Sequence, residues 1–187
     1  MLIIIAFAVA LLLKSFVIQA FFIPSASMEQ TLKIGDRVLV EKVSLRFGEP
    51  GRGDVVVFEK DLGAQPVDPP EPSVLEKVRD SFRELFGFPV GTKQDFIKRV
   101  IAVEGDSIEG RDGVVFVNGE QVDEPYLEEG VETSSFGPVD IPEDMIFVMG
   151  DNRENSDDSR NFGPVPVDDV VGRAFLLIWP PADFSTL

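Results

Sequence analysis

Residues 94–103, QDFIKRVIAV, have the pattern of a strand inside a sheet. Successive side chains of a strand point to opposite faces, so Lys98 and Arg99 each lie among apolar neighbours on their own face. These neighbours are Phe96, Val100 and Ala102 on the first face and Ile97, Ile101 and Val103 on the second. Two mostly apolar faces are typical of a central strand. A lysine is rarely buried without a partner, so Lys98 either extends its amine to solvent or has a function.

Other apolar segments predict the remaining strands of a mainly β domain. They are residues 16–23, 38–43, 55–58, 114–117, 145–149 and 170–179. Turn signals at 111–113 and 118–119 flank one of these segments and predict a small β meander. The acidic, proline-containing residues 123–144 predict a surface loop, and Pro180-Pro181 is expected to end the last strand. We therefore expect one β domain over residues 15–187, with a small inserted β subdomain at 105–144.

Residues 73–88 predict a short inserted helix. Ser73 and Glu76 have the spacing of a capping box. Apolar residues follow at helical spacing, namely Val74, Leu75, Val78, Leu85, Phe82 and Phe86. Packing of this stripe against the domain is the main interpretation, and contact with a membrane surface is the alternative.

Residues 1–13, MLIIIAFAVALLL, are apolar without interruption, and residues 2–13 predict a membrane helix, with Lys14 at the membrane surface. Residues 1–14 are thus expected to be a transmembrane anchor. A secretory signal peptide is the alternative, but the basic residues that precede its apolar core are missing. Twelve helical residues span only about 18 Å of the ~30 Å hydrocarbon core, so we expect the anchor to be truncated in this sequence.

The composition limits the chemistry. The 187 residues carry a net charge of −16 at pH 7, which argues against nucleic-acid binding. The absence of cysteine excludes disulfides, thiolate nucleophiles and cysteine-ligated zinc. The absence of histidine excludes a Ser-His-Asp triad and histidine-ligated metals, so a hydrolase of this composition needs lysine, a carboxylate or an α-amine as its base. We expect neither a metal nor a cofactor.

The segment PSASMEQTL, residues 24–32, is the candidate nucleophile loop. It contains Ser25 and Ser27 among small residues that would let a peptide approach closely. Alone, such a pair is more typical of a turn. Combined with Lys98 it suggests a serine nucleophile and a lysine base, provided that burial lowers the lysine pKa from about 10.4 towards ~8.

A polar loop, GDNRENSDDSRNFG, follows the strand predicted at 145–149 and occupies residues 150–163. Its composition is similar to that of a calcium-binding loop. However, Arg153 stands where the third position should be a ligand, and the sixth position is not glycine, so an EF-hand is rejected.

Taken in order, these segments resemble the bacterial type I signal peptidases, which are membrane-anchored Ser/Lys proteases. The matching blocks are the apolar anchor, PSASMEQTL with IGDRVLVEK, RGDVVVF, KRVIAVEGD and GDNRENSDDSRNFG. The resemblance implies the β fold shared by signal peptidases and SOS repressors. It implies Ser27 as nucleophile and Lys98 as general base, with Ser25 Oγ and the Ser27 N–H as the oxyanion hole. It further implies that Ser156 orients Lys98, that Arg99 pairs with Asp151 and Asp158 with Arg160, and that Met28 shapes the site.

The same resemblance implies partners and location. The substrates would be secretory preproteins with small residues at the first and third positions before the cut, as in Ala-x-Ala. The protein would contact membrane lipid, cross the membrane once and hold its catalytic domain on the extracytoplasmic side. Gln30 replaces the usual proline of the family, which is expected to loosen the turn after the nucleophile. Two alternatives stay open, a self-cleaving protease of the SOS-repressor type and a non-enzymatic, membrane-tethered β domain.

Overall fold

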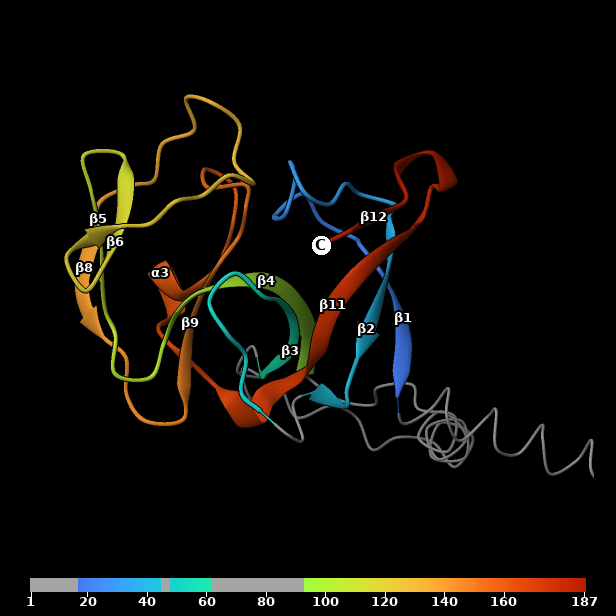
Figure 1. The fold of residues 1–187 in the computed structure, drawn as a ribbon, viewed down its shortest axis with the longest axis horizontal. Coiled ribbons are helices and arrows are strands. Elements are labelled where there is room, and N and C mark those ends of the chain that lie inside the picture. Colours follow the sequence, from blue (N-terminus) through green and yellow to red (C-terminus); the bar gives the residue numbers. More distant parts are fainter. Residues whose placement is uncertain (1–16, 45–47, 62–92) are drawn as a thin grey trace, which may run out of the picture. The chain divides into compact units, whose positions relative to one another are not determined.

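The computed structural model describes residues 17–44, 48–61 and 93–187 (Figure 1). The chain divides into two compact units, residues 1–58 with 97–187 and residues 59–96. The helix expected at 73–88 and the anchor expected at 1–14 both lie outside the described residues. Within those ranges no helix is long and apolar enough to cross a membrane.

Strands far outnumber helices in the described chain, which confirms the mainly β prediction. The larger sheet has the order β1-β2-β11-β3-β4-β9-β10, and β12 pairs with β11. Its strands are β1 (Ile18–Phe22), β2 (Arg37–Glu41), β3 (Val55–Asp61), β4 (Lys93–Val103), β9 (Met145–Met149), β10 (Val165–Pro166), β11 (Val170–Trp179) and β12 (Ser185–Thr186). Three short helices follow β9, namely α3 (Ser159–Phe162), η2 (Val167–Asp169) and η3 (Pro181–Asp183).

Strand β4 is central, as predicted, because it lies between β3 and β9. Its predicted alternation nevertheless fails after Val100. Val100 pairs with Val148 and Ala102 with Phe147, so Ile101 is an extra residue at a β-bulge. Ile101 and Ala102 consequently pack in one apolar cluster with Phe147, and the prediction that they occupy opposite faces is wrong.

The smaller sheet has the order β7-β6-β5-β8. It consists of β5 (Ser107–Arg111), β6 (Val114–Val117), β7 (Glu120–Gln121) and β8 (Phe136–Asp140). The two predicted turns are confirmed, because Asp112-Gly113 and Asn118-Gly119 both have the positive φ angles that a two-residue hairpin turn requires. The prediction of a loop throughout 123–144 is wrong for β8. Its glycine and proline depress strand propensity, but both are tolerated on an edge strand.

The C-terminal segment also differs from the prediction. Pro180-Pro181 does end β11, but β12 then pairs back onto it, with Leu176 opposite Thr186. Thus β11 is not the last strand. It is an interior strand that pairs with both β2 and β3 and so holds the two halves of the larger sheet together.

Candidate active site

Buried apolar side chains fix the loop between β1 and β2 that contains Ser27. Ile23, Met28 and Leu32 are almost fully buried and belong to the core cluster formed with β2, β3 and β11. The N–H of Leu32 donates to the carbonyl of Met28, which closes a turn immediately after the serine. The loop is therefore anchored on both sides of Ser27, while the Ser27 side chain remains partly exposed.

Strand β4 brings Lys98 to Ser27. The Lys98 Nζ atom lies 2.6 Å from Ser27 Oγ and also donates to the carbonyl of Ile97 at 2.9 Å. Lys98 is only 2% exposed, so its amine is held in a pocket that solvent barely reaches. Two residues 71 positions apart in the sequence thus form a direct hydrogen bond.

Burial lowers the pKa of Lys98 from 10.5 to about 8. The carboxylates of Asp158, Asp157 and Asp151 act in the opposite direction, because a negative charge favours the ammonium form. The removal of the amine from water is therefore the larger effect. A substantial fraction of Lys98 is neutral near pH 8, and only a neutral amine can accept a proton from a hydroxyl.

Two hydrogen-bond donors lie close to this pair. Ser25 Oγ is 3.5 Å from Ser27 Oγ, and its side chain is exposed. The backbone N–H of Ser27 makes no hydrogen bond to any other group in the described ranges. A hydroxyl and a free N–H beside the same oxygen are the kind of donors that stabilise a tetrahedral oxyanion.

The hydrogen bond expected between Ser156 and Lys98 is not present. Ser156 Oγ is buried but has no hydrogen-bond partner of normal geometry among the described residues. It lies instead near the Asp158 carboxylate and against the Cα atom of Gly150. The role of Ser156 in orienting Lys98 therefore stays a prediction that no hydrogen bond of the described chain supports.

The two expected ion pairs are both formed, and the first reaches the nucleophile loop. Arg99 donates to both carboxylate oxygens of Asp151, at 3.0 and 2.7 Å, and to the carbonyl of Gly53. Asp151 also accepts a hydrogen bond of 2.5 Å from Thr31 Oγ1. Arg99 and Asp151 therefore tie β4, the start of the polar loop and the nucleophile loop to one another.

The second ion pair organises the polar loop itself. Arg160 donates to both oxygens of Asp158 at 2.8 Å, and the N–H of Gly150 donates to the same carboxylate at 2.9 Å. Burial alone would raise the pKa of Asp158, but these hydrogen bonds outweigh it and lower the pKa. Asp158 thus stays ionised and holds both ends of the loop. Nowhere in the described part of the chain do three or more carboxylates gather as a metal site would require.

Sequence reasoning missed the two residues that contact the Ser27 backbone most closely. The N–H of Asn152 donates to the Ser27 carbonyl at 3.1 Å, and its side-chain amide donates to the Ala26 carbonyl at 3.0 Å. Gly150 lies so close that a Cβ atom there would collide with the Ser27 carbonyl oxygen and with Ser156. A glycine directly after a buried strand was the signal for such a close approach.

Gln30, which was expected to loosen the turn after the nucleophile, has a backbone conformation there that proline could not adopt. Its φ of 105° cannot be adopted by proline, whose ring fixes φ near −65°. Its side-chain Oε1 accepts a hydrogen bond of 2.8 Å from the N–H of Glu128. Gln30 thus ties the turn to the connection between β7 and β8.

We expect Gly150→Ala to reduce both activity and stability. A methyl group must displace the Ser27 carbonyl, and a misplacement of about 1 Å costs about 10²-fold in turnover. Overpacking of this kind costs about 1–3 kcal/mol. Peptide cleavage and thermal unfolding measure the two effects. Gly51→Ala is the matched control, because a Cβ atom there meets only Asp54 at an ordinary 3.8 Å. Equal rates in the two variants would show that Gly150 does not constrain the nucleophile loop.

Comparison with known proteins gives a consistent result. A family model described as signal peptidase, peptidase S26, matches residues 1–179. A probable signal peptidase I-2 of Synechocystis sp. is 38% identical, over 94% of this chain and 69% of that protein. A signal peptidase I of Mycobacterium tuberculosis is 36% identical, over 98% of this chain and 72% of that protein. A crystal structure of a signal peptidase I from Enterococcus faecalis V583 is 27% identical, covers 67% of this chain and 97% of its own, and has a TM-score of 0.44.

The matched range contains both Ser27 and Lys98, the two side chains that meet at 2.6 Å. It also contains the polar loop that holds the Ser27 backbone. The chain therefore belongs to the signal peptidase family, peptidase S26, and is a serine peptidase.

Proposed function

We propose that this protein is a membrane-bound endopeptidase that removes N-terminal signal peptides from secretory preproteins by a Ser/Lys mechanism. The observation that carries the proposal is the 2.6 Å contact between Ser27 Oγ and the buried amine of Lys98, whose pKa is lowered to about 8. A serine nucleophile needs a proton acceptor within hydrogen-bond reach, and this chain has no histidine to serve as one. Family membership supports the substrate class.

In the first half of the reaction, neutral Lys98 accepts the hydroxyl proton as Ser27 Oγ attacks the carbonyl carbon of the scissile bond. The negative charge that develops on the carbonyl oxygen is stabilised by the Ser25 hydroxyl and the Ser27 N–H. The Lys98 ammonium then donates its proton to the leaving nitrogen. The peptide bond breaks, and the signal peptide remains as an ester on Ser27.

In the second half, water replaces the leaving amine. Lys98, neutral again, accepts a proton from that water as its oxygen attacks the ester carbonyl. The same two donors stabilise the second oxyanion, and Lys98 returns the proton to Ser27 Oγ. The pairs Arg99–Asp151 and Asp158–Arg160 take no proton in this scheme, and we assign them the role of holding the polar loop against Ser27.

The preprotein would bind in an extended conformation along strand edges, with main-chain hydrogen bonds supplying affinity. We propose a preference for small residues at the first and third positions before the cut, as in Ala-x-Ala. Pockets that admit only small side chains provide this selectivity, since each excluded methylene changes binding by about 1–3 kcal/mol.

We further propose a single membrane span, an extracytoplasmic catalytic domain and direct contact with lipid. Phe22, Ile34, Trp179 and Phe184 are each more than half exposed. Phe22 and Trp179 pair with Arg37 from its two sides, so all three residues lie at one end of the sheet, with Arg37 in the middle. Exposed aromatic residues beside a basic residue are typical of a contact with the membrane interface.

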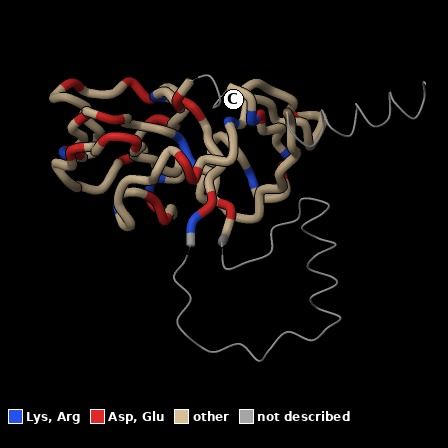
Figure 2. Tube along the Cα trace, turned by 90° about the horizontal axis from the view of Figure 1, so that it is seen from below, with Lys and Arg blue, Asp and Glu red and all other residues tan. Residues whose placement is uncertain are grey.

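The charge distribution is consistent with that orientation. Residues 104–144 contain 13 acidic residues and 1 basic residue, whereas residues 17–44 contain 3 of each. Figure 2 shows the acidic residues recurring along the second sheet and the loops beside it. The segment around β1 and β2 can therefore approach an anionic lipid surface with less repulsion than the second sheet would meet.

The direct test is incubation of the purified full chain with a preprotein that carries one Ala-x-Ala site, followed by mass measurement of the products. We expect two fragments, cut directly after the second alanine. Cleavage of the chain itself, with an intact preprotein, would support the self-cleaving alternative. Binding without any cleavage would support a tethered binding domain.

Ser25→Ala is expected to reduce kcat by about 10²–10³-fold and to leave KM nearly unchanged, because one of two oxyanion donors is lost. Steady-state cleavage of the same preprotein measures both constants. Ser135→Ala is the matched control, since this serine is also exposed but lies in the connection before β8. If Ser25→Ala and the control kept equal kcat values, the oxyanion assignment would be wrong.

A further inference from the structure

The connection between β7 and β8, residues 122–135, contacts three segments of the candidate active site. The N–H of Glu128 donates to Gln30 in the nucleophile loop. The ring of Tyr126 lies under the guanidinium of Arg99, with 3.9 Å between Arg99 Cζ and the ring centroid. A third contact joins this connection to Arg153 in the polar loop. The reaction scheme above uses none of these three contacts.

The contact with Arg153 is a buried ion pair with Glu124. The Arg153 side chain is fully buried and that of Glu124 is about 10% exposed. Both terminal nitrogens of Arg153 donate to the Glu124 carboxylate, and one of them also donates to Thr133 Oγ1 at 2.7 Å. The remaining nitrogen, Nε, donates to the carbonyl of Gly150 at 3.2 Å. Arg153 therefore connects Glu124 to Gly150, the glycine that packs against the Ser27 carbonyl.

Tyr126 joins the two halves of this network. Its hydroxyl donates to Glu124 at 2.7 Å, while its ring supports Arg99. Burial and the neighbouring Glu124 raise the pKa of Tyr126, so the hydroxyl keeps its proton and remains a donor. Arg99 in turn pairs with Asp151, the residue after Gly150. Both routes thus end on the same short segment, residues 150–153.

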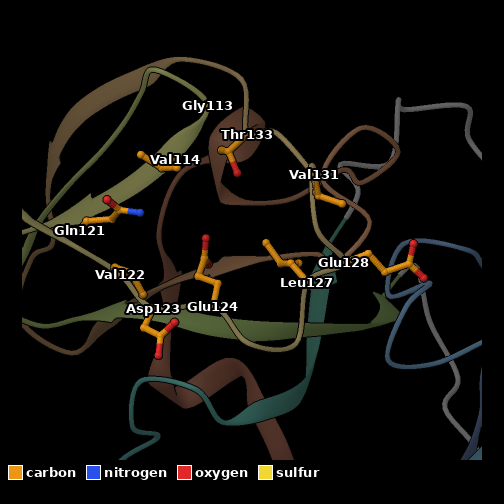
Figure 3. Close-up of a pocket in the computed structure, with 10 residues that line it drawn as sticks. All are labelled: Gly113, Val114, Gln121, Val122, Asp123, Glu124, Leu127, Glu128, Val131 and Thr133. Atoms are coloured by element: carbon orange, nitrogen blue, oxygen red, sulfur yellow. The ribbon is translucent and has the colours of Figure 1, made fainter.

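A pocket of about 460 Å³ lies beside this connection, which lines it together with Gly113, Val114 and Gln121 of the second sheet (Figure 3). Glu124 and Thr133 both point into this space, and Leu127 and Val131 form part of its wall. The second sheet holds both ends of the connection, because the N–H of Val122 donates to the carbonyl of Val115 at 2.9 Å and the N–H of Thr133 donates to that of Gly113 at 2.8 Å. Between these ends, the contacts with Arg153, Arg99 and Gln30 join the connection to the candidate active site.

We propose that Glu124 and Tyr126 are positioning residues for the Ser27–Lys98 pair, acting through Arg153 and Arg99 on residues 150–153. Residues 150–153 hold the Ser27 backbone through the N–H of Asn152 and the close approach of Gly150. The second sheet therefore supplies a clamp for the catalytic loops. This inference rests on the proposed function, which it deepens by assigning a role to residues that touch neither substrate nor nucleophile.

The test uses Glu124→Gln, Tyr126→Leu and Tyr126→Phe in the full chain. Glu124→Gln and Tyr126→Leu are expected to lower kcat for the preprotein by about 10- to 100-fold with little change in KM, since small misplacements have effects of this size. Tyr126→Phe keeps the ring under Arg99 and should lose less. Glu129→Gln is the matched control, because Glu129 is an exposed carboxylate of the same connection. Thermal unfolding identifies any variant that does not fold.

A second readout needs no substrate, namely the titration of the Lys98 side chain followed by NMR, with Lys98→Ala to assign the signal. Burial is the main cause of its lowered pKa, while Asp151, Asp157 and Asp158 oppose the shift. Loosening residues 150–153 admits water to the amine, so the midpoint should move upward from about 8 in Glu124→Gln and Tyr126→Leu. A role in stability alone would leave this midpoint unchanged.

The outcomes separate this inference from the proposed function. A wild-type protein that does not cleave the preprotein refutes the proposed function, while the Lys98 titration still tests the clamp. The clamp is refuted if folded Glu124→Gln and Tyr126→Leu proteins titrate Lys98 with the wild-type midpoint. It is also refuted if the wild type cleaves the preprotein and these two variants have the same kcat as the wild type. A shifted midpoint in these variants, with no shift in Glu129→Gln, supports it.

Discussion

Ser27→Ala is expected to abolish preprotein cleavage while the protein stays folded. The substitution removes the only atom in the proposed scheme that bonds to the substrate carbonyl, and losses of about 10⁶-fold in kcat accompany removal of a serine nucleophile. The fold should survive, because the Ser27 hydroxyl is partly exposed and the loop is anchored by Met28 and Leu32. Product masses and circular dichroism measure the two properties.

The same variant separates an enzyme from a binding domain. In a non-enzymatic protein the Ser27 hydroxyl would have no special role, so Ser27→Ala and the control Ser135→Ala would behave alike. Retention of wild-type cleavage by Ser27→Ala, in a preparation free of wild-type protein, would show that another group is the nucleophile.

The strands could be predicted where the local pattern of apolar and polar residues agrees with the structure of the segment. Residues 145–149 and 170–179 were predicted with the bounds that β9 and β11 have, because both are continuous apolar runs between polar or proline-containing segments. Strand β8 was missed because FGPVD has low strand propensity, and its pairing with β5 is a tertiary effect. The bulge at Ile101 is likewise invisible in the sequence, since it arises from the register between β4 and β9.

The candidate site could be predicted only in part. The absence of histidine and the apolar surroundings of Lys98 suggested a lysine base, and the order of the segments suggested its partner serine. The clamp could not be predicted, because Glu124 and Tyr126 lie in an acidic segment that has the composition of an exposed loop. Their burial depends on Arg153 and Arg99, which come from distant parts of the chain. Ser156 was assigned to Lys98 by resemblance, but its position follows from the close packing at Gly150.

Activity is expected to rise with pH along a single limb whose midpoint lies near 8, the lowered pKa of Lys98. Only the neutral amine accepts the Ser27 proton, so below this midpoint the rate should fall about tenfold per pH unit, and above it the rate should level off. The pH dependence of kcat/KM reports the pKa of the free enzyme. A midpoint near 10.5, the ordinary value for lysine, would mean that the amine is not buried in solution.

Lys98→Arg should abolish turnover at every pH on that limb, because a guanidinium does not lose its proton in this range. Lys98→Met is the matched variant, since it keeps a long side chain but has no amine, and it should be equally inactive.

The folded-state pKa of Lys98 is below its unfolded value, so burying this amine costs stability below pH 8, and the cost disappears as the pH rises through 10.5. Lys98→Met removes that cost and should therefore unfold at no lower temperature than the wild type at neutral pH. An inactive but stable Lys98→Met protein identifies the amine as a chemical group of the reaction, whereas an active Lys98→Arg protein would require a different base for Ser27.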